Sequence, residues 1–123
     1  MKRLFRSFGF AWKGIKSVFR TESNMKIHVS VAIFVVVMGF LLQISQSEWL
    51  AVIFCIGLVI CSEMINTAFE TLVDKVSPEK DPLAGKTKDI AAGAVLICAG
   101  ISVVVGVIVF LPKLIKFLAS LLY

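Results

Sequence analysis

The sequence WLAVIFCIGLVICSEMINTAFETLV, residues 49–73, decides how the chain is organised. Its first fourteen residues carry no charge, and Glu63, Asn66 and Glu70 follow them. On an α-helix, which turns about 100° per residue, Glu70 and Asp74 each fall within about 20° of Glu63. Ionised side chains in a membrane helix are costly and by default mark a functional site. We therefore expect a membrane-spanning helix that carries a site on its charged stripe.

The composition is that of an integral membrane protein. The 123 residues are 59% hydrophobic, and the mean hydropathy is +0.95, which is too apolar for an ordinary soluble domain. Thirteen Lys and Arg face eight Asp and Glu, for a net charge of +5, and seven of these cations fall in the first 26 residues. Anionic headgroups and the cytoplasmic excess of cations explain this pattern better than nucleic acid, so we expect no nucleic-acid partner.

The three cysteines are expected to be small buried hydrophobic residues. Cys55, Cys61 and Cys98 all lie inside apolar runs and lack the spacing of a metal site.

Residues 1–21 are predicted to form a basic amphipathic helix on the membrane surface. Apolar residues recur at helical spacing between Leu4 and Phe19, and cations fill the positions between them. Such a helix lies in the cytoplasmic interface rather than crossing the membrane. It is either a simple anchor, or its cations also reach an anionic ligand.

The rest of the chain predicts three spans in one domain, at residues 25–44, 49–73 and 82–111, the last with a cytoplasmic extension. Residues 74–81 form a polar cytoplasmic loop, in which Ser77-Pro78 ends one helix and Asp81-Pro82 begins the next. Pro112 ends or kinks the third helix, which leaves a tail at 112–123. Because eleven of the thirteen cations then lie inside, we expect a cytoplasmic N-terminus and an external C-terminus.

The charged stripe runs from the lipid into the cytosol. Glu63 lies about 21 Å below Trp49 at 1.5 Å per residue, in the inner leaflet, and Glu70 and Asp74 lie at or past the boundary. Such a site could join a membrane-borne substrate to a soluble one. His28, at the cytoplasmic end of the first span, is interpreted as a polar border residue.

These residue types suit phosphoryl transfer. Carboxylate and amide oxygens bind Mg²⁺ together with phosphate oxygens, and Lys88 could hold a phosphate. A carboxylate held partly out of water could act as a general base toward a hydroxyl. From the residues alone, a structural polar network between helices is an equal alternative.

Two longer motifs favour an enzyme. Glu63-Met64-Ile65-Asn66-Thr67-Ala68-Phe69-Glu70, followed by Val73-Asp74, resembles the E-x-x-N-[ST]-A-x-E…VD signature of the prokaryotic diacylglycerol kinase family. Residues 88–95, KDIAAGAV, resemble its block at the start of the third span, and Trp12-Lys13-Gly14 matches its surface helix. Residues 24–28 and 76–80 resemble the Gram-positive branch, whose members are undecaprenol kinases.

The resemblance implies an all-α integral membrane protein with a surface helix and three spans, assembled as a homotrimer in the bacterial cell membrane with its active site on the cytoplasmic side. It implies transfer of the ATP γ-phosphate to a lipid alcohol, with Glu63 as general base and Asn66 at the reaction centre. Glu22 and Glu70 would hold Mg²⁺. The nucleotide would be bound by residues from the surface helix, the metal site, the loop and the third span: Arg3, Phe10, Glu22, Glu70, Glu79, Asp81, Lys88 and Asp89.

Some of these positions depart from the family pattern. Phe10 stands where the enterobacterial form has Tyr, so a hydroxyl is lost, and Asp81 stands where that form has His. Asp74 is interpreted as structural.

The acceptor is expected to be undecaprenol, with diacylglycerol as the alternative. A small transporter or holin-like pore of the same three helices would leave both motifs unexplained.

Overall fold

The computed structural model describes residues 1–122, and these form four α-helices. Helix α1 is Lys2–Thr21, α2 is Ser23–Leu41, α3 is Gln46–Val76 and α4 is Pro82–Leu122. The described part of the chain has no β-strand. Helices α2, α3 and α4 are each long and apolar enough to cross a membrane. The expected all-α membrane fold is therefore confirmed.

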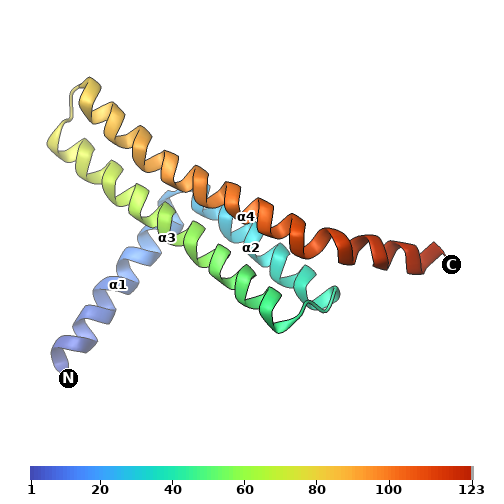
Figure 1. The fold of residues 1–123 in the computed structure, drawn as a ribbon. Helices are drawn as coiled ribbons and strands as arrows, with labels where there is room; N and C mark the ends of the chain where they lie inside the picture. Colours follow the sequence, from blue (N-terminus) through green and yellow to red (C-terminus); the bar gives the residue numbers. More distant parts are fainter. Residues whose placement is uncertain (123) are drawn as a thin grey trace.

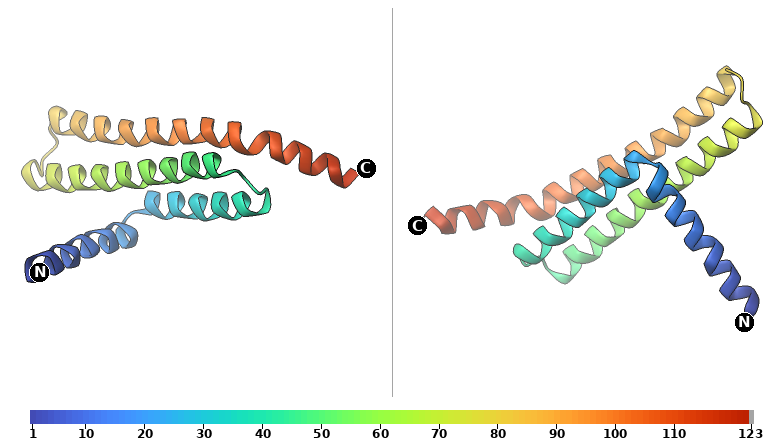
Figure 2. Two further views of the ribbon diagram at one scale, coloured as in Figure 1. Left: turned by 60° about the horizontal axis from the view of Figure 1, so that its bottom comes forward. Right: turned by 180° about the vertical axis from the view of Figure 1, so that it is seen from behind.

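Helices α2, α3 and α4 lie side by side with alternating direction, and α3 is in the middle (Figures 1 and 2). Helix α1 leaves this layer obliquely, so that the N-terminus lies far from the bundle (Figure 1). The small core at the end where α3 begins is formed by Ile44, Val52 and Val109. Most large apolar side chains face outward instead, as expected for helices that meet lipid.

A single residue separates α1 from α2. Glu22 is extended, with φ −94° and ψ 117°, and it ends one helix and precedes the next. The predicted surface helix and first span left a break at residues 22–24, but Ser23 and Asn24 already belong to α2. The predicted surface helix and the first span therefore meet at Glu22 alone.

The connection between α2 and α3, residues 42–45, lies earlier in the chain than the predicted one at residues 45–48. Gln43, at φ 49°, reverses the chain after Leu41, and the amide of Ile44 donates to the carbonyl of Gly39 at 3.1 Å. A capping box then begins α3 at Gln46. The amide of Glu48 donates to Ser45 Oγ at 3.3 Å, and the amide of Ser45 donates to the Glu48 carboxylate at 2.6 Å.

The ends of α3 and α4 at the loop follow the predicted stop and start signals. Helix α3 ends at Val76, just before Ser77-Pro78, so that residues 74–76, predicted as loop, continue the helix. Asp81 accepts hydrogen bonds from the amides of Leu83 and Ala84 at 3.4 and 3.1 Å, as an N-cap should.

Helix α4 does not end at Pro112 but continues to Leu122, and it changes direction in its last third (Figure 2). Lys113 Nζ, immediately after the proline, lies 3.1 Å from Glu48 and fixes this turn against α3.

Candidate active site

Glu63 and Asn66 of α3 face a hollow of about 290 Å³ between α2, α3 and α4. Glu63 is only 2% exposed and Asn66 only 6%, and they are the two buried polar side chains in the described chain. The hollow is lined by residues of all three helices: Asn24, Ile27, His28, Glu63, Asn66, Ala92, Val95, Leu96 and Ala99. A buried carboxylate beside a buried amide is costly in an apolar bundle, and it therefore indicates a site.

Two further carboxylates lie close to Glu63. Glu70 and Glu22 are near enough to repel its negative charge. The amide of Asn66 holds Glu70 in place, since its Nδ2 donates to Glu70 Oε1 at 3.2 Å. Glu22 accepts a hydrogen bond from Thr21 Oγ1 at 2.9 Å. The chain thus brings together four of the residues that the sequence selected.

The sequence interpretation of His28 was incomplete. Its Nε2 lies 3.8 Å from Glu63 Oε2, and the ring lines the same hollow as the carboxylate. Asn24, one helical turn earlier, lines it too. The signal for both was the spacing of four residues, which places two polar side chains on one helix face.

A second hollow lies at the loop between α3 and α4. It is lined by Glu79, Asp81 and Lys88 together with Asp74. Lys88 Nζ forms an ion pair with Asp74, which joins the two helices. Asp74 is eleven residues from Glu63, or about 16 Å along α3. The candidate nucleotide residues of the loop are therefore separated from the buried carboxylate by the length of three helical turns.

The remaining candidate residues lie apart from both hollows. Phe10 is 69% exposed on α1, with Lys13 Nζ 5.8 Å from its ring centre. Arg3 and Asp89 are exposed on α1 and α4. Within one chain, the structure brings these three to neither hollow.

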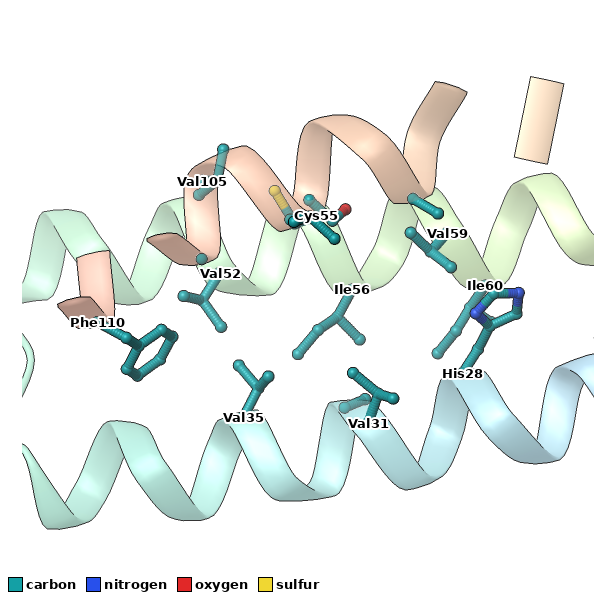
Figure 3. A pocket seen from close by; sticks show the side chains of 15 residues that line it. His28, Val31, Val35, Val52, Cys55, Ile56, Val59, Ile60, Val105 and Phe110 are labelled. Atoms are coloured by element: carbon teal, nitrogen blue, oxygen red, sulfur yellow. The ribbon is translucent and has the colours of Figure 1, made fainter. Parts of the chain in front are cut away.

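An apolar groove of about 260 Å³ lies next to the hollow that holds Glu63 (Figure 3). It runs between α2, α3 and α4 from His28 to Phe110, and Val31, Ile56 and Val59 line its length. His28 and Ala99 line both this groove and the hollow that holds Glu63. The apolar groove and the hollow that holds Glu63 are therefore neighbours that share two lining residues.

Sequence comparisons identify the family of the chain. Residues 9–110 match the family model described as "Prokaryotic diacylglycerol kinase". The chain belongs to the prokaryotic diacylglycerol kinase family. It is a membrane-located lipid kinase, and the resemblance seen in its motifs is confirmed.

Three relatives illustrate the range of the family. The undecaprenol kinase of Bacillus subtilis (strain 168) is 42% identical over 93% of each chain. The diacylglycerol kinase of Synechocystis sp. is 36% identical over 92% of this chain and 65% of its own. The diacylglycerol kinase of Escherichia coli (strain K12) is 28% identical over 83% of this chain and 84% of its own.

A kinase of this family uses a nucleotide and a divalent cation, and the oxygen atoms at the buried end of the stripe fit such an ion. Asn66 Oδ1 is buried without a hydrogen-bond partner among residues 1–122, and the Glu70 carboxylate lies beside it. No group of three or more His, Cys, Asp or Glu in the described residues is arranged to hold a metal. One or two carboxylates are nevertheless enough for a cation that is also bound by phosphate oxygens.

Proposed function

We propose that this kinase phosphorylates undecaprenol, giving undecaprenyl phosphate and ADP. The observation that supports this acceptor is the apolar groove that adjoins the hollow of Glu63. A polyprenol has one long apolar chain and a terminal hydroxyl. The hydroxyl end of such a chain suits an apolar groove that lies next to a buried carboxylate. The Bacillus subtilis relative is named for the same substrate.

Glu63 is the general base in this proposal. Its carboxylate takes the proton of the lipid hydroxyl as that oxygen bonds to the γ-phosphorus, and ADP leaves with the electrons of the broken bond. Burial supports the role, because a carboxylate that is 2% exposed is shielded from water that would compete with the alcohol. Asn66, one turn away on the same face, positions the reacting groups.

Glu22 and Glu70 are proposed to bind Mg²⁺ with the phosphates. The charges of both act on Glu63, and the unpartnered Asn66 Oδ1 adds a buried oxygen on the side chain that holds Glu70. The ion, when bound, supplies positive charge against the triphosphate. Replacing either glutamate by Gln should raise the Mg²⁺ concentration needed for half-maximal activity, and an unchanged Mg²⁺ dependence would refute this assignment.

The nucleotide is proposed to bind toward the loop between α3 and α4. Lys88, Glu79 and Asp81 line the hollow there. Arg3, Phe10 and Asp89 are assigned to the nucleotide from the family resemblance alone. The carboxylate of Asp81 already caps α4, so any contact with the nucleoside competes with that role.

The active form is proposed to be a homotrimer in the bacterial cell membrane, with the N-terminus and the active site on the cytoplasmic side. The resemblance to the family and the excess of cations in the predicted cytoplasmic segments support this arrangement.

A lipid-acceptor assay tests the proposed function. Purified protein is given labelled Mg-ATP and either undecaprenol or diacylglycerol at equal mole fraction in the same mixed micelles. We expect a higher kcat/KM for undecaprenol. A preference for diacylglycerol would change the acceptor and keep the chemistry, whereas labelling of neither lipid by folded protein would contradict the proposal as a whole.

A further inference from the structure

His28 occupies the junction between the apolar groove and the hollow that holds Glu63. It lines both spaces, and in Figure 3 its ring lies at one end of the groove, beside Ile60, with Phe110 at the other end. A lipid chain in the groove would therefore pass this imidazole just before its hydroxyl reaches the carboxylate.

His28 also makes the charged-group contact between α2 and α3. Three such contacts exist among residues 1–122, and the other two, Lys88 with Asp74 and Lys113 with Glu48, join α3 to α4. On α2, His28, whose side chain is 21% exposed, therefore faces Glu63 together with Asn24.

Four other side chains lie near Glu63. Glu22 and Glu70 carry the same charge and repel it, and Asn24 of α2 can donate its amide to the carboxylate, whereas Asn66 donates its amide to Glu70. His28 differs from all four because it also lines the apolar groove. The imidazole can donate an N–H without changing its own charge. The separation of 3.8 Å is too long for a hydrogen bond, but such contacts often shorten only when substrate binds.

We propose that His28 is a positioning residue for phosphoryl transfer. In the substrate complex, one ring N–H donates to one oxygen of Glu63 and fixes the orientation of the carboxylate. The second oxygen then faces the lipid hydroxyl that enters from the groove. His28 itself neither takes nor gives a proton. This inference rests on the proposed role of Glu63 as general base.

The test compares two substitutions that differ in one property. His28→Gln keeps a side-chain N–H donor, and His28→Leu keeps bulk without a donor. We expect kcat of the Leu variant to fall about 10- to 100-fold, as is typical when the partner of a catalytic group is lost. The KM for Mg-ATP should stay unchanged, and the Gln variant should recover most of kcat.

A matched control is Ser30→Ala on the same helix. Ser30 is exposed, and its hydroxyl bonds only to the carbonyl of Lys26, so this variant should keep wild-type kcat. Thermal unfolding in detergent establishes that all variants are folded. If the Leu variant keeps wild-type kcat, or if Gln rescues nothing, the positioning role is overturned.

A double-mutant cycle separates this inference from the proposed function. If His28 acts through Glu63, His28→Leu should cost little more in the Glu63→Gln background. An equal loss in both backgrounds would overturn the positioning role. A fully active Glu63→Gln single variant would instead overturn the assignment of Glu63 itself.

Discussion

At the scale of single residues, the central question is why a carboxylate is retained among the apolar side chains of a membrane bundle. Glu63 is buried near two carboxylates that repel it, Glu22 and Glu70, and near two side chains of α2 that can stabilise its charge, His28 and Asn24. Because a buried charge destabilises a membrane bundle, the presence of this carboxylate indicates a catalytic or binding role rather than a packing role.

Replacement of Glu63 by Gln should remove the base and keep the shape. We expect turnover to fall by about 10²- to 10⁴-fold, the usual contribution of general-base catalysis, while the variant remains folded. Steady-state phosphorylation of undecaprenol measures the loss, and thermal unfolding checks the fold. Full turnover in the variant would refute the base role.

Gly39 shows a purely structural constraint at the same scale. A Cβ at this position would lie 2.7 Å from Cη2 and 2.9 Å from Cζ2 of Trp49. We therefore expect Gly39→Ala to destabilise the fold by about 1–3 kcal/mol, as overpacking does. Gly57→Ala is the matched control, because a Cβ there meets nothing within 4 Å. Thermal unfolding in one detergent compares the two, and equal midpoints would contradict the packing argument.

At the scale of helices, the start of α3 depends on a capping box. Ser45→Ala removes the side-chain acceptor for the amide of Glu48 and should cost about 1 kcal/mol. Ser47→Ala, two residues later, serves as control, since the Ser47 hydroxyl contacts only Ser45 Oγ. Unfolding midpoints in detergent should fall for the first variant and stay nearly constant for the second. A similar fall in both would show that the cap contributes little.

The sequence predicted the helices better than their ends. The three spans could be predicted from their long uncharged runs. The loop near Lys88 could be predicted from two helix-boundary signals, Ser77-Pro78 and Asp81-Pro82. The early start at Gln46 was missed although the S-x-x-E pattern was present at Ser45. The direction that α4 takes after Pro112 depends on a contact with a distant segment, the ion pair of Lys113 with Glu48. The local sequence around Pro112 does not reveal this contact.

The candidate site was predictable where it lies on one helix. Glu63, Asn66 and Glu70 share a stripe that helical periodicity reveals. The approach of His28 and Glu22 depends on how α2 packs against α3, which one helix cannot specify. The periodicity therefore found the carboxylates but not the imidazole that faces one of them.

At the scale of the whole molecule, the membrane orientation can be tested directly. In a variant lacking Cys55, Cys61 and Cys98, single cysteines are placed at Lys80 in the α3–α4 loop and at Gln46 at the start of α3. In intact cells, an impermeant thiol reagent should label Gln46→Cys and spare Lys80→Cys, because the loop is predicted to be cytoplasmic. Lysed cells, where both should react, are the control, and the reverse pattern would invert the topology.

Glu22 couples the tilt of the surface helix α1 to the proposed metal site. It is the one non-helical residue between α1 and α2, and its side chain is also a proposed metal ligand. The two backbone dihedral angles that aim this carboxylate are therefore the same two that set the tilt of the amphipathic helix against the first span. A surface that bends more sharply than a bilayer, such as a small micelle, would change that tilt. The curvature of the lipid or detergent surface should therefore affect how Glu22 is placed at the proposed metal site. Comparing activity at saturating substrate in micelles and in large vesicles would measure this effect.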